Sequence, residues 1–364
     1  MSYSKICFFA VAIAAVAFAS CSDEPRAITS DSEKVDNAGN GGGIEGFYVL
    51  NEGNMGSNKA TIDLFKYSTG TYTRNIFSER NLEAIKELGD VGNDIAINNG
   101  RLYVVLNGSH KVEVCDAATT RSLGHVNVNT PRFMAFNGNG SVVRFDATTL
   151  QVTGTCPVGL QPEEMVVSDG KLYVANSTDN NGTYDDTISI IDLNTFKLAG
   201  TISAAINMHH LRIDDYGNMW ATSRGNYYDI AGSVVLLQKV DGGEYVKVNE
   251  YSMECTNLSI SGSHMYYYSV VYDANWNATN TVYVCDIDAS GLNGSATTFI
   301  TDGSDKDIIS PYCIAAQPSD GTLLITDAKN YVSSGMVYCY SAAGKKLWSA
   351  TTGDIPGHIA FVTK

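Results

Sequence analysis

Three histidines stand where their imidazoles could act together with carboxylates. His209, His210 and His358 each lie at the start of a short β-rich run, and acidic residues occupy similar positions elsewhere, namely Glu163, Glu164, Asp90, Asp94 and Asp354. A histidine and a carboxylate can serve as general base and general acid. However, no G-x-S-x-G, H-E-x-x-H or paired-cysteine motif accompanies them, and a histidine that begins a strand more often caps a backbone group. We therefore predict no catalytic residues and no enzyme activity, with a lyase or hydrolase as the alternative.

The cysteines and acidic loops give little sign of a metal centre. Six cysteines follow Cys7 and Cys21, and none of them forms a C-x-x-C pair or a cysteine–histidine ligand pair. Three of them, Cys115, Cys285 and Cys339, fall at one repeat position, and we expect these to be buried core residues, with disulfides as the alternative. The stretch "DNNGTYDD" misses the ligand spacing of an EF-hand calcium loop. We predict neither a metal nor a cofactor.

Aromatic and amide side chains gather in segments between strand-like runs. One of these, "STDNNGTYDD", is much longer than the two to five residues that usually join a hairpin. Tyrosine and tryptophan offer rigid contact area with a polar tip, and amides both donate and accept hydrogen bonds. Such a set suits a large, neutral ligand with a polar rim, although the aromatics could instead pack the loops against one another. We predict ligand contacts from Asn51, Asn54, Asn107, Arg132, Tyr184, His209, Arg224, Tyr227, Tyr228, Tyr272, Trp276, Asn330, Tyr331 and His358.

The elements that would position these residues form an internal repeat. Each unit has a short apolar run, a Gly or Asp turn, a "LYV"-type strand, a variable loop and two further strands, as in "EEMVVSDGKLYVANSTDNNGTYDDTISIIDLNTFKLAGTI". Four strands in a unit of this length are typical of β-propeller blades. In a propeller, the connections into the inner strands and those between second and third strands emerge on one face, which usually carries function.

Counting the repeats predicts an all-β, seven-bladed propeller with a shortened third blade. The segment "RFMAFNGNGSVVRFDATTLQVTGTC" lacks the "LYV" strand and its loop. The first unit lacks an inner strand and the chain ends on the orphan strand "GHIAFV", so we expect the C-terminal strand to close the ring on the first blade. The only helical pattern, "SERNLEAIKELG", predicts a short helix with Ser78 as N-cap.

The N-terminus has the pattern of a bacterial lipoprotein. An apolar run precedes "FASC", which resembles a lipobox, and the acidic "SDEP" that follows resembles the surface-export signal of Bacteroidota lipoproteins. We predict a signal peptide over residues 1–20, a lipidated Cys21 within a flexible tether over 21–45, and a propeller over 46–364. An ordinary secretory signal is the alternative. The expected location is the outer membrane, facing the exterior and held only by the lipid.

The charge balance limits the partners. The formal net charge is −15 at pH 7, with a sequence pI of about 4.7. Such a chain is a poor partner for nucleic acid and is repelled by anionic lipid.

Several stretches resemble one family across residues 46–364. The segments "VLNEGN", "ELGDVGND", "INMHHLR" and "TDAKNYVS" look like those of the YncE-like propeller lipoproteins of Bacteroidota, and most closely like the BtuG-type proteins. The resemblance implies capture of cobalamin or another corrinoid and its delivery to a TonB-dependent outer-membrane transporter. A surface propeller that binds only protein is the third possibility. Relatives carry a full third blade, so any ligand contact from that loop would be absent here.

Overall fold

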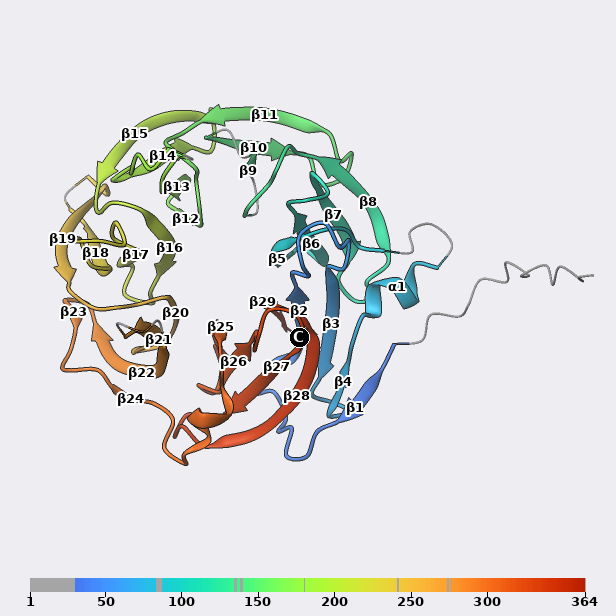
Figure 1. The fold of residues 1–364 in the computed structure, drawn as a ribbon. Helices are drawn as coiled ribbons and strands as arrows, with labels where there is room; N and C mark the ends of the chain where they lie inside the picture. Colours follow the sequence, from blue (N-terminus) through green and yellow to red (C-terminus); the bar gives the residue numbers. More distant parts are fainter. Residues whose placement is uncertain are drawn as a thin grey trace, which may run out of the picture.

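The fold is a ring of antiparallel sheets around a central axis (Figure 1). The computed structural model describes residues 30–82, 87–133, 136–137, 140–179, 181–240, 242–273, 275 and 277–363. Cys21 and the predicted signal peptide lie outside these residues, as does Trp276. None of the helices in the described ranges is long and apolar enough to span a membrane.

Six sheets contain at least four strands each. The first combines β1 (Ser32–Lys34), β4 (Thr71–Thr73), β3 (Thr61–Lys66), β2 (Ile44–Asn51) and β29 (Pro356–Thr363). The second complete sheet contains, in order, β5 (Gly92–Asn98), β6 (Arg101–Leu106), β7 (Lys111–Asp116) and β8 (Ser122–Asn127). The third contains β12 (Met165–Ser168), β13 (Lys171–Ala175), β14 (Thr187–Asp192) and β15 (Lys197–Ser203).

The remaining complete sheets follow the same order along the chain. They are β16 (Met208–Ile213), β17 (Met219–Ser223), β18 (Ser233–Lys239) and β19 (Tyr245–Tyr251); β20 (Asn257–Ser261), β21 (His264–Tyr272) and β22 (Ala278–Asp288) with the short β23 (Gly291–Leu292) and β24 (Thr297–Thr298); and β25 (Pro311–Ala316), β26 (Leu323–Asp327), β27 (Ser334–Tyr340) and β28 (Lys346–Asp354).

The predicted count of seven blades is wrong, because the structure is a propeller of six complete blades. The sheet between the second and fourth repeats holds only β9 (Phe136–Asn137), β10 (Ser141–Phe145) and β11 (Val152–Pro157). Its inner strand has two residues, and it lacks the strand that each complete blade has in second position. Too few residues separate Phe133 from Ser141 to supply two paired strands. This sector, called the short sheet below, therefore fills part of the ring without forming a blade.

The C-terminal strand closes the ring. β29 pairs antiparallel with β2 over nearly its whole length, with Phe47 opposite Phe361 and Val49 opposite Ile359. β29 thereby becomes the inner strand of the first sheet and covers the edge of β2, which would otherwise be unpaired. The N-terminal β1 pairs with β4 at the outer edge of the same sheet, within the segment predicted to be a flexible tether.

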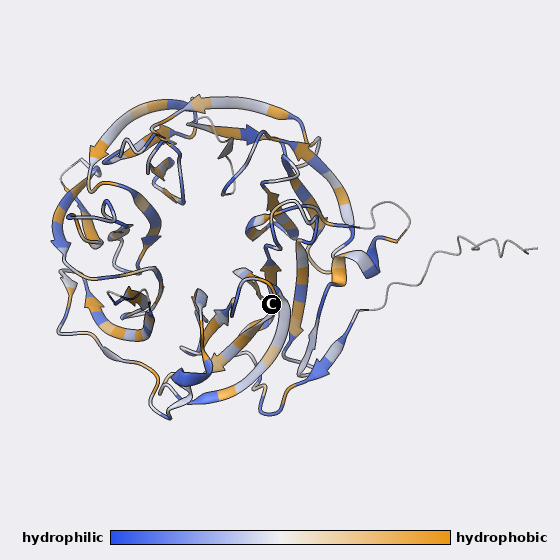
Figure 2. Cartoon of the chain, in the orientation of Figure 1, coloured by the Kyte–Doolittle hydropathy of each residue, from blue (hydrophilic) through white to orange (hydrophobic). Residues whose placement is uncertain are grey.

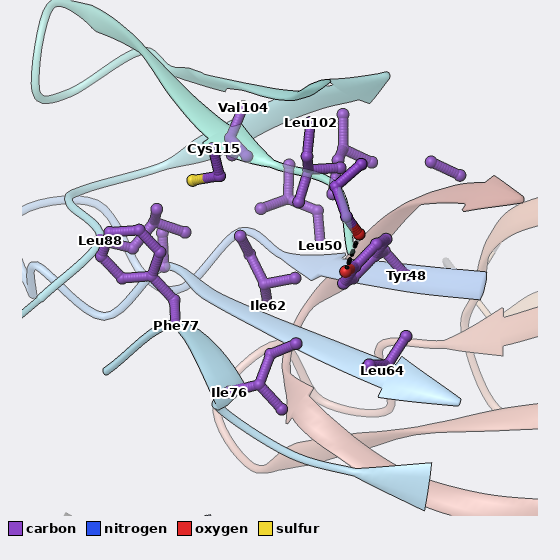
Figure 3. Close-up of a cluster of buried hydrophobic side chains, with 14 of the residues drawn as sticks. Tyr48, Leu50, Ile62, Leu64, Ile76, Phe77, Leu88, Leu102, Val104 and Cys115 are labelled. Atoms are coloured by element: carbon purple, nitrogen blue, oxygen red, sulfur yellow. Dashed lines mark hydrogen bonds between the residues drawn. The ribbon is translucent and has the colours of Figure 1, made fainter. Parts of the chain in front are cut away.

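The core lies between neighbouring sheets. Hydrophobic residues concentrate on the strands (Figure 2), and seven clusters of buried side chains join adjacent sheets. Figure 3 shows the cluster between the first two blades, where Leu50 and Ile62 face Leu102 and Cys115. The six cysteines of the propeller are free and buried, which confirms the predicted packing role of Cys115, Cys285 and Cys339.

The helix begins earlier than predicted. α1 (Ile76–Arg80) follows Asn75, whose φ of 51° places it in the left-handed region, and Ser78 lies inside the helix. The predicted N-cap is wrong because Ile76 and Phe77 are fully buried in the core between the first two blades, which fixes where the helix starts. A single 3₁₀ turn, η1 (Ser304–Asp307), precedes β25.

Candidate ligand-binding face

One face of the ring is built from two sets of loops that are tied together. We call it the loop face; it holds the connections into the inner strands and the loops between second and third strands. Asp185 Oδ2 accepts a hydrogen bond from the Leu160 N–H at 2.9 Å, and Asp90 accepts those of Gly56 and Asn58 at 2.8 and 3.1 Å. In the last blade, Asp327 accepts the Ser310 N–H at 2.7 Å. These aspartates hold each pair of loops in one arrangement, so residues on both loops keep fixed positions.

The long loop after β13 is internally braced. Asp179 Oδ1 accepts the backbone N–H groups of Asn181 and Thr183, both at 2.8 Å. These bonds lower the pKa of the Asp179 carboxyl, most of all the one from Thr183. Tyr184 donates its hydroxyl to the carbonyl of Asn226 at 3.2 Å, in the corresponding loop of the next blade. The extra length therefore links two neighbouring loops of this face.

Four of the predicted contact residues form exposed aromatic surface on the loop face. Tyr228 is 93% exposed and Tyr227 69%, and Tyr272 and Tyr331 are also exposed. The Tyr331 ring packs edge-on against Tyr312, with 5.8 Å between centroids. Tyrosines that are not buried by their own blade remain able to cover a ligand.

The predicted asparagines lie in different environments. Asn51 is fully buried and donates from Nδ2 to Thr61 at 3.0 Å, so it does not reach the exposed face. Asn54 accepts the Ser57 hydroxyl with its backbone carbonyl, and Asn330 Oδ1 accepts the N–H groups of residues 332 and 333. Asn107 donates to the Pro131 carbonyl at 3.0 Å and borders a cavity.

A cavity of about 550 Å³ opens on this face next to the short sheet. Its lining residues are Asn107, Thr130, Arg132, Gly140, Val158, Gly159, Leu160, Gln161, Thr178, Asp179 and Asp185. They come from the loops on both sides of the short sheet and from the turn at Gly140 that precedes β10. The second-to-third-strand loop that the short sheet lacks would otherwise stand in this part of the face.

Three charged residues converge beside this cavity, and we call them the mouth cluster: Arg132, Glu163 and Arg224. The Glu163 side chain is 2% exposed. Arg132 Nη2 lies 3.1 Å from Glu163 Oε1, and Arg224 Nη1 lies 3.6 Å from the same oxygen. Sequence reasoning selected both arginines as ligand contacts but did not place Glu163 between them.

A second carboxyl lies near the cluster. Tyr312 donates its hydroxyl to Glu52 Oε2 at 3.1 Å. Burial raises the pKa of the Glu52 carboxyl to about 7, and the hydrogen bond from Tyr312 and the charge of Arg132 offset only part of that effect. Neither Glu52 nor Tyr312 was singled out from sequence, although Glu52 begins the loop after β2 and Tyr312 lies near the start of β25.

Deeper in the channel, charges are paired. Glu164 forms an ion pair with Arg212, with 3.2 Å between Oε1 and Nη2, and its Oε1 lies 2.9 Å from His210 Nδ1. Burial raises the pKa of the Glu164 carboxyl, but Arg212 and His210 outweigh it and hold this pKa below its usual value. A carboxylate held in this way is a poor proton acceptor near neutral pH.

Phe133 stands between two of the predicted histidines. Its ring lies edge-on to His209 and to His358, with centroid distances of 6.1 and 6.0 Å. Burial is the main cause that lowers the pKa of both imidazoles, so both are neutral at physiological pH. Beyond Phe133 a second cavity of about 470 Å³ is lined by Asp94, Glu164, Arg212, His358 and Cys313, among others.

These features define a β-propeller with a polar channel and a loop face that carries exposed tyrosines. The chain belongs to the family described as "Domain of unknown function (DUF5074)", whose model matches residues 45–357. No curated protein matches the sequence.

Solved structures share the fold at low sequence identity. A hypothetical selenium-binding protein from Sulfolobus tokodaii has a TM-score of 0.61 and 11% identity, covering 87% of this chain and 93% of that one. A quinonprotein alcohol dehydrogenase-like protein from Bacteroides thetaiotaomicron has a TM-score of 0.61, 15% identity and coverages of 87% and 78%. A putative 6-phosphogluconolactonase from Bacteroides uniformis has a TM-score of 0.61, 14% identity and coverages of 87% and 100%. These structures support the resemblance to YncE-like proteins as far as the propeller fold.

Proposed function

We propose that this protein is a non-catalytic surface lipoprotein that captures a corrinoid, such as cobalamin, on its loop face. The observation that carries the proposal is the exposed tyrosine surface, formed by Tyr227, Tyr228, Tyr272 and Tyr331. Exposed tyrosines suit contact with a large, flat ligand at low entropic cost. A corrinoid is large, fringed with amides and weakly charged, and amides are matched by Tyr hydroxyls and loop backbone groups.

The cavity beside the short sheet adds a polar recess to this surface. Its volume of about 550 Å³ lies within the usual range for small-molecule sites. A corrinoid would extend beyond this recess across the neighbouring loops, with one part of the molecule inside. The choice of a corrinoid over other large polar ligands rests on the resemblance to BtuG-type proteins.

The proposed setting follows from the N-terminal pattern. Lipidation of Cys21 would anchor the protein on the outer membrane, where it would pass the ligand to a TonB-dependent transporter. A Cys21→Ala variant should lose radiolabelled palmitate and leave the membrane fraction. Labelling and fractionation that match the unsubstituted chain would refute the anchor.

The paired charges in the channel support a binding role over catalysis. Glu164 is the carboxylate nearest to a histidine, and its ion pair with Arg212 keeps it from exchanging protons near neutral pH. The neighbouring His209 and His358 are half-buried, and desolvation lowers the pKa of both imidazoles, so both are neutral at physiological pH.

Titration calorimetry of the full-length chain in detergent tests the capture role, with cyanocobalamin as ligand and maltose as control. We expect one corrinoid per chain and no heat with maltose. A folded protein that gives no heat with cyanocobalamin would reject corrinoid capture.

Tyrosine variants test where the ligand binds. We expect Tyr227→Ala or Tyr331→Ala to weaken cyanocobalamin binding, by about 1–3 kcal/mol for a central contact. Tyr216→Ala is the matched control, because Tyr216 is exposed in a loop between first and second strands, at the opposite face. Equal losses of cyanocobalamin affinity in all three variants would show that the ligand does not bind at the tyrosines of the loop face.

A further inference from the structure

The mouth cluster holds more positive than negative charge. Arg132 approaches both oxygens of Glu163, with Nη2 3.1 Å from Oε1 and Nε 3.4 Å from Oε2. Arg224 reaches the same Oε1 only at 3.6 Å. One carboxylate thus faces two guanidinium groups, and arginine stays charged at any physiological pH. These three residues together carry a net charge of +1 in a protein whose net charge is −15, and the nearby Glu52 carboxyl, whose pKa burial raises to about 7, is only partly ionised at neutral pH.

Arg224 keeps its hydrogen-bond donors free. Among the described residues, its guanidinium makes no hydrogen bond, and its contact with Glu163 is an ion pair beyond hydrogen-bond distance. Its side chain is 30% exposed, so the free donors are accessible from the loop face. A guanidinium with unused donors beside a second cation is suited to an incoming oxyanion.

Arg132 is held in a fixed orientation. The Glu163 carboxylate accepts hydrogen bonds from the Nε and Nη2 of Arg132. The Gln161 amide is oriented so that its oxygen accepts from Arg132 Nη1 at 3.2 Å and its nitrogen donates to the Thr178 carbonyl. Arg132 also lines the 550 Å³ cavity. The protein therefore positions one guanidinium rigidly at the edge of a recess.

The carboxylates nearest to the recess are occupied. Asp185 accepts the N–H groups of Leu160 and Thr187 at 2.9 Å each, and Asp179 accepts those of Asn181 and Thr183. These bonds tie both carboxylates to loop backbone, and among the described residues the ion pairs of Arg132 and Arg224 are with Glu163. Among the residues that line the recess, Arg132 is the only cation.

We propose that Arg132 and Arg224 form a subsite for one oxyanion, a phosphate or a carboxylate, at the mouth of the channel. This inference rests on the proposed function and specifies it: the phosphodiester of the cobalamin nucleotide arm would occupy the subsite while the corrin ring lies on the tyrosines. Arginine forks match the geometry of phosphate and carboxylate oxygens, which a lysine does not reproduce.

The first test uses inorganic phosphate and needs no corrinoid. We expect phosphate to raise the melting temperature of the full-length chain more than sodium chloride of equal ionic strength, and Arg224→Gln to abolish that difference. Arg121→Gln is the control, because Arg121 is exposed in a loop between third and fourth strands, away from the loop face. An identical phosphate effect in Arg224→Gln and Arg121→Gln would overturn the subsite.

The second test compares two corrinoids. Dicyanocobinamide lacks the nucleotide arm and its phosphodiester, whereas cyanocobalamin carries both. We expect Arg224→Gln to lower the affinity for cyanocobalamin by tenfold or more and to leave that for dicyanocobinamide unchanged. Arg224→Lys, which keeps the charge and is the milder change for folding, should lower the cyanocobalamin affinity by a smaller factor.

The two tests separate the subsite from the corrinoid. A phosphate effect that depends on Arg224, together with no heat from either corrinoid, would support the subsite and reject corrinoid capture. Equal losses for cyanocobalamin and dicyanocobinamide in Arg224→Gln would support corrinoid capture and reject the phosphodiester as occupant.

Discussion

Arg212 of β16 and Glu164, just ahead of β12, form an ion pair between two adjacent blades, with 3.2 Å between Nη2 and Oε1. The pair lies on the wall of the central channel, and the Glu164 carboxylate also accepts the Leu211 backbone N–H at 3.2 Å. It therefore adds a side-chain link between the two blades, next to the backbone hydrogen bond that the Glu164 N–H donates to the His209 carbonyl at 3.1 Å.

Removing the cation of this pair should destabilise the fold. Arg212→Met leaves the Glu164 carboxylate without its main partner, and we expect a loss of about 2 kcal/mol in the free energy of unfolding. This is below the roughly 3–5 kcal/mol of a fully buried pair, because the Arg212 side chain is a third exposed. Urea denaturation at pH 7 measures the loss. An unchanged midpoint would show that the pair contributes nothing.

The same pair makes stability depend on acid. The folded pKa of Glu164 is depressed below the unfolded value, so its contribution is present above about pH 4.5 and is lost as pH falls through the folded pKa. Glu164→Gln should flatten this part of the stability profile. Thermal melts between pH 3 and pH 6 compare the variant with the unsubstituted chain, and parallel profiles would contradict the prediction.

Glu52 should give the opposite dependence at higher pH. Burial raises its folded pKa from 4.5 to about 7, so the folded state binds a proton that the unfolded state has lost. Stability from this group therefore falls as pH rises from about 4.5 to about 7, and the full penalty persists above that. Glu52→Gln keeps the polar contact with Tyr312 without the ionisation. Thermal melts should show that this variant is more stable than the unsubstituted chain at pH 8 but not at pH 5. The same difference in stability at both pH values would contradict the prediction.

The aromatic stack at the ring closure should carry much of the stability of the first blade. Trp348 of β28 stacks on Phe65 of β3 at 4.7 Å and is buried, whereas its neighbour Leu347 points outward. We expect Trp348→Ala to cost about 3–5 kcal/mol and Leu347→Ala to change the stability by no more than about 0.5 kcal/mol. Guanidinium denaturation measures the free energy of unfolding of both variants. Similar losses of stability in the two variants would refute the prediction.

Phe133 should control the protonation of the two channel histidines. Its ring helps to keep water from His209 and His358, and burial is the main cause that lowers their pKa values. In Phe133→Ala we expect both pKa values to rise, which NMR titration of labelled histidines detects. His264 is the internal control, since it lies exposed on β21. Unshifted His209 and His358 signals would mean that Phe133 does not shield them.

The propeller class was readable from the sequence because strand patterns are local. Alternating apolar runs bounded by Gly and Asp turns predict strands whatever their neighbours are, and the orphan "GHIAFV" predicted the closure that β29 makes with β2. The buried position of Cys115, Cys285 and Cys339 followed from the same alternation, since these three residues lie on strands β7, β22 and β27.

The number of complete blades and the make-up of the site were decided by tertiary structure. Repeat counting scored the segment after Phe133 as a blade, but pairing left it with a two-residue inner strand. Asn51 looked like a loop amide and is buried at the end of β2. Arg132 and Arg224 lie in loops of different sheets and meet at Glu163 only because the ring brings these loops to one channel mouth. Strand propensity depends on a few neighbouring residues, whereas such convergence depends on how all the sheets pack around the axis.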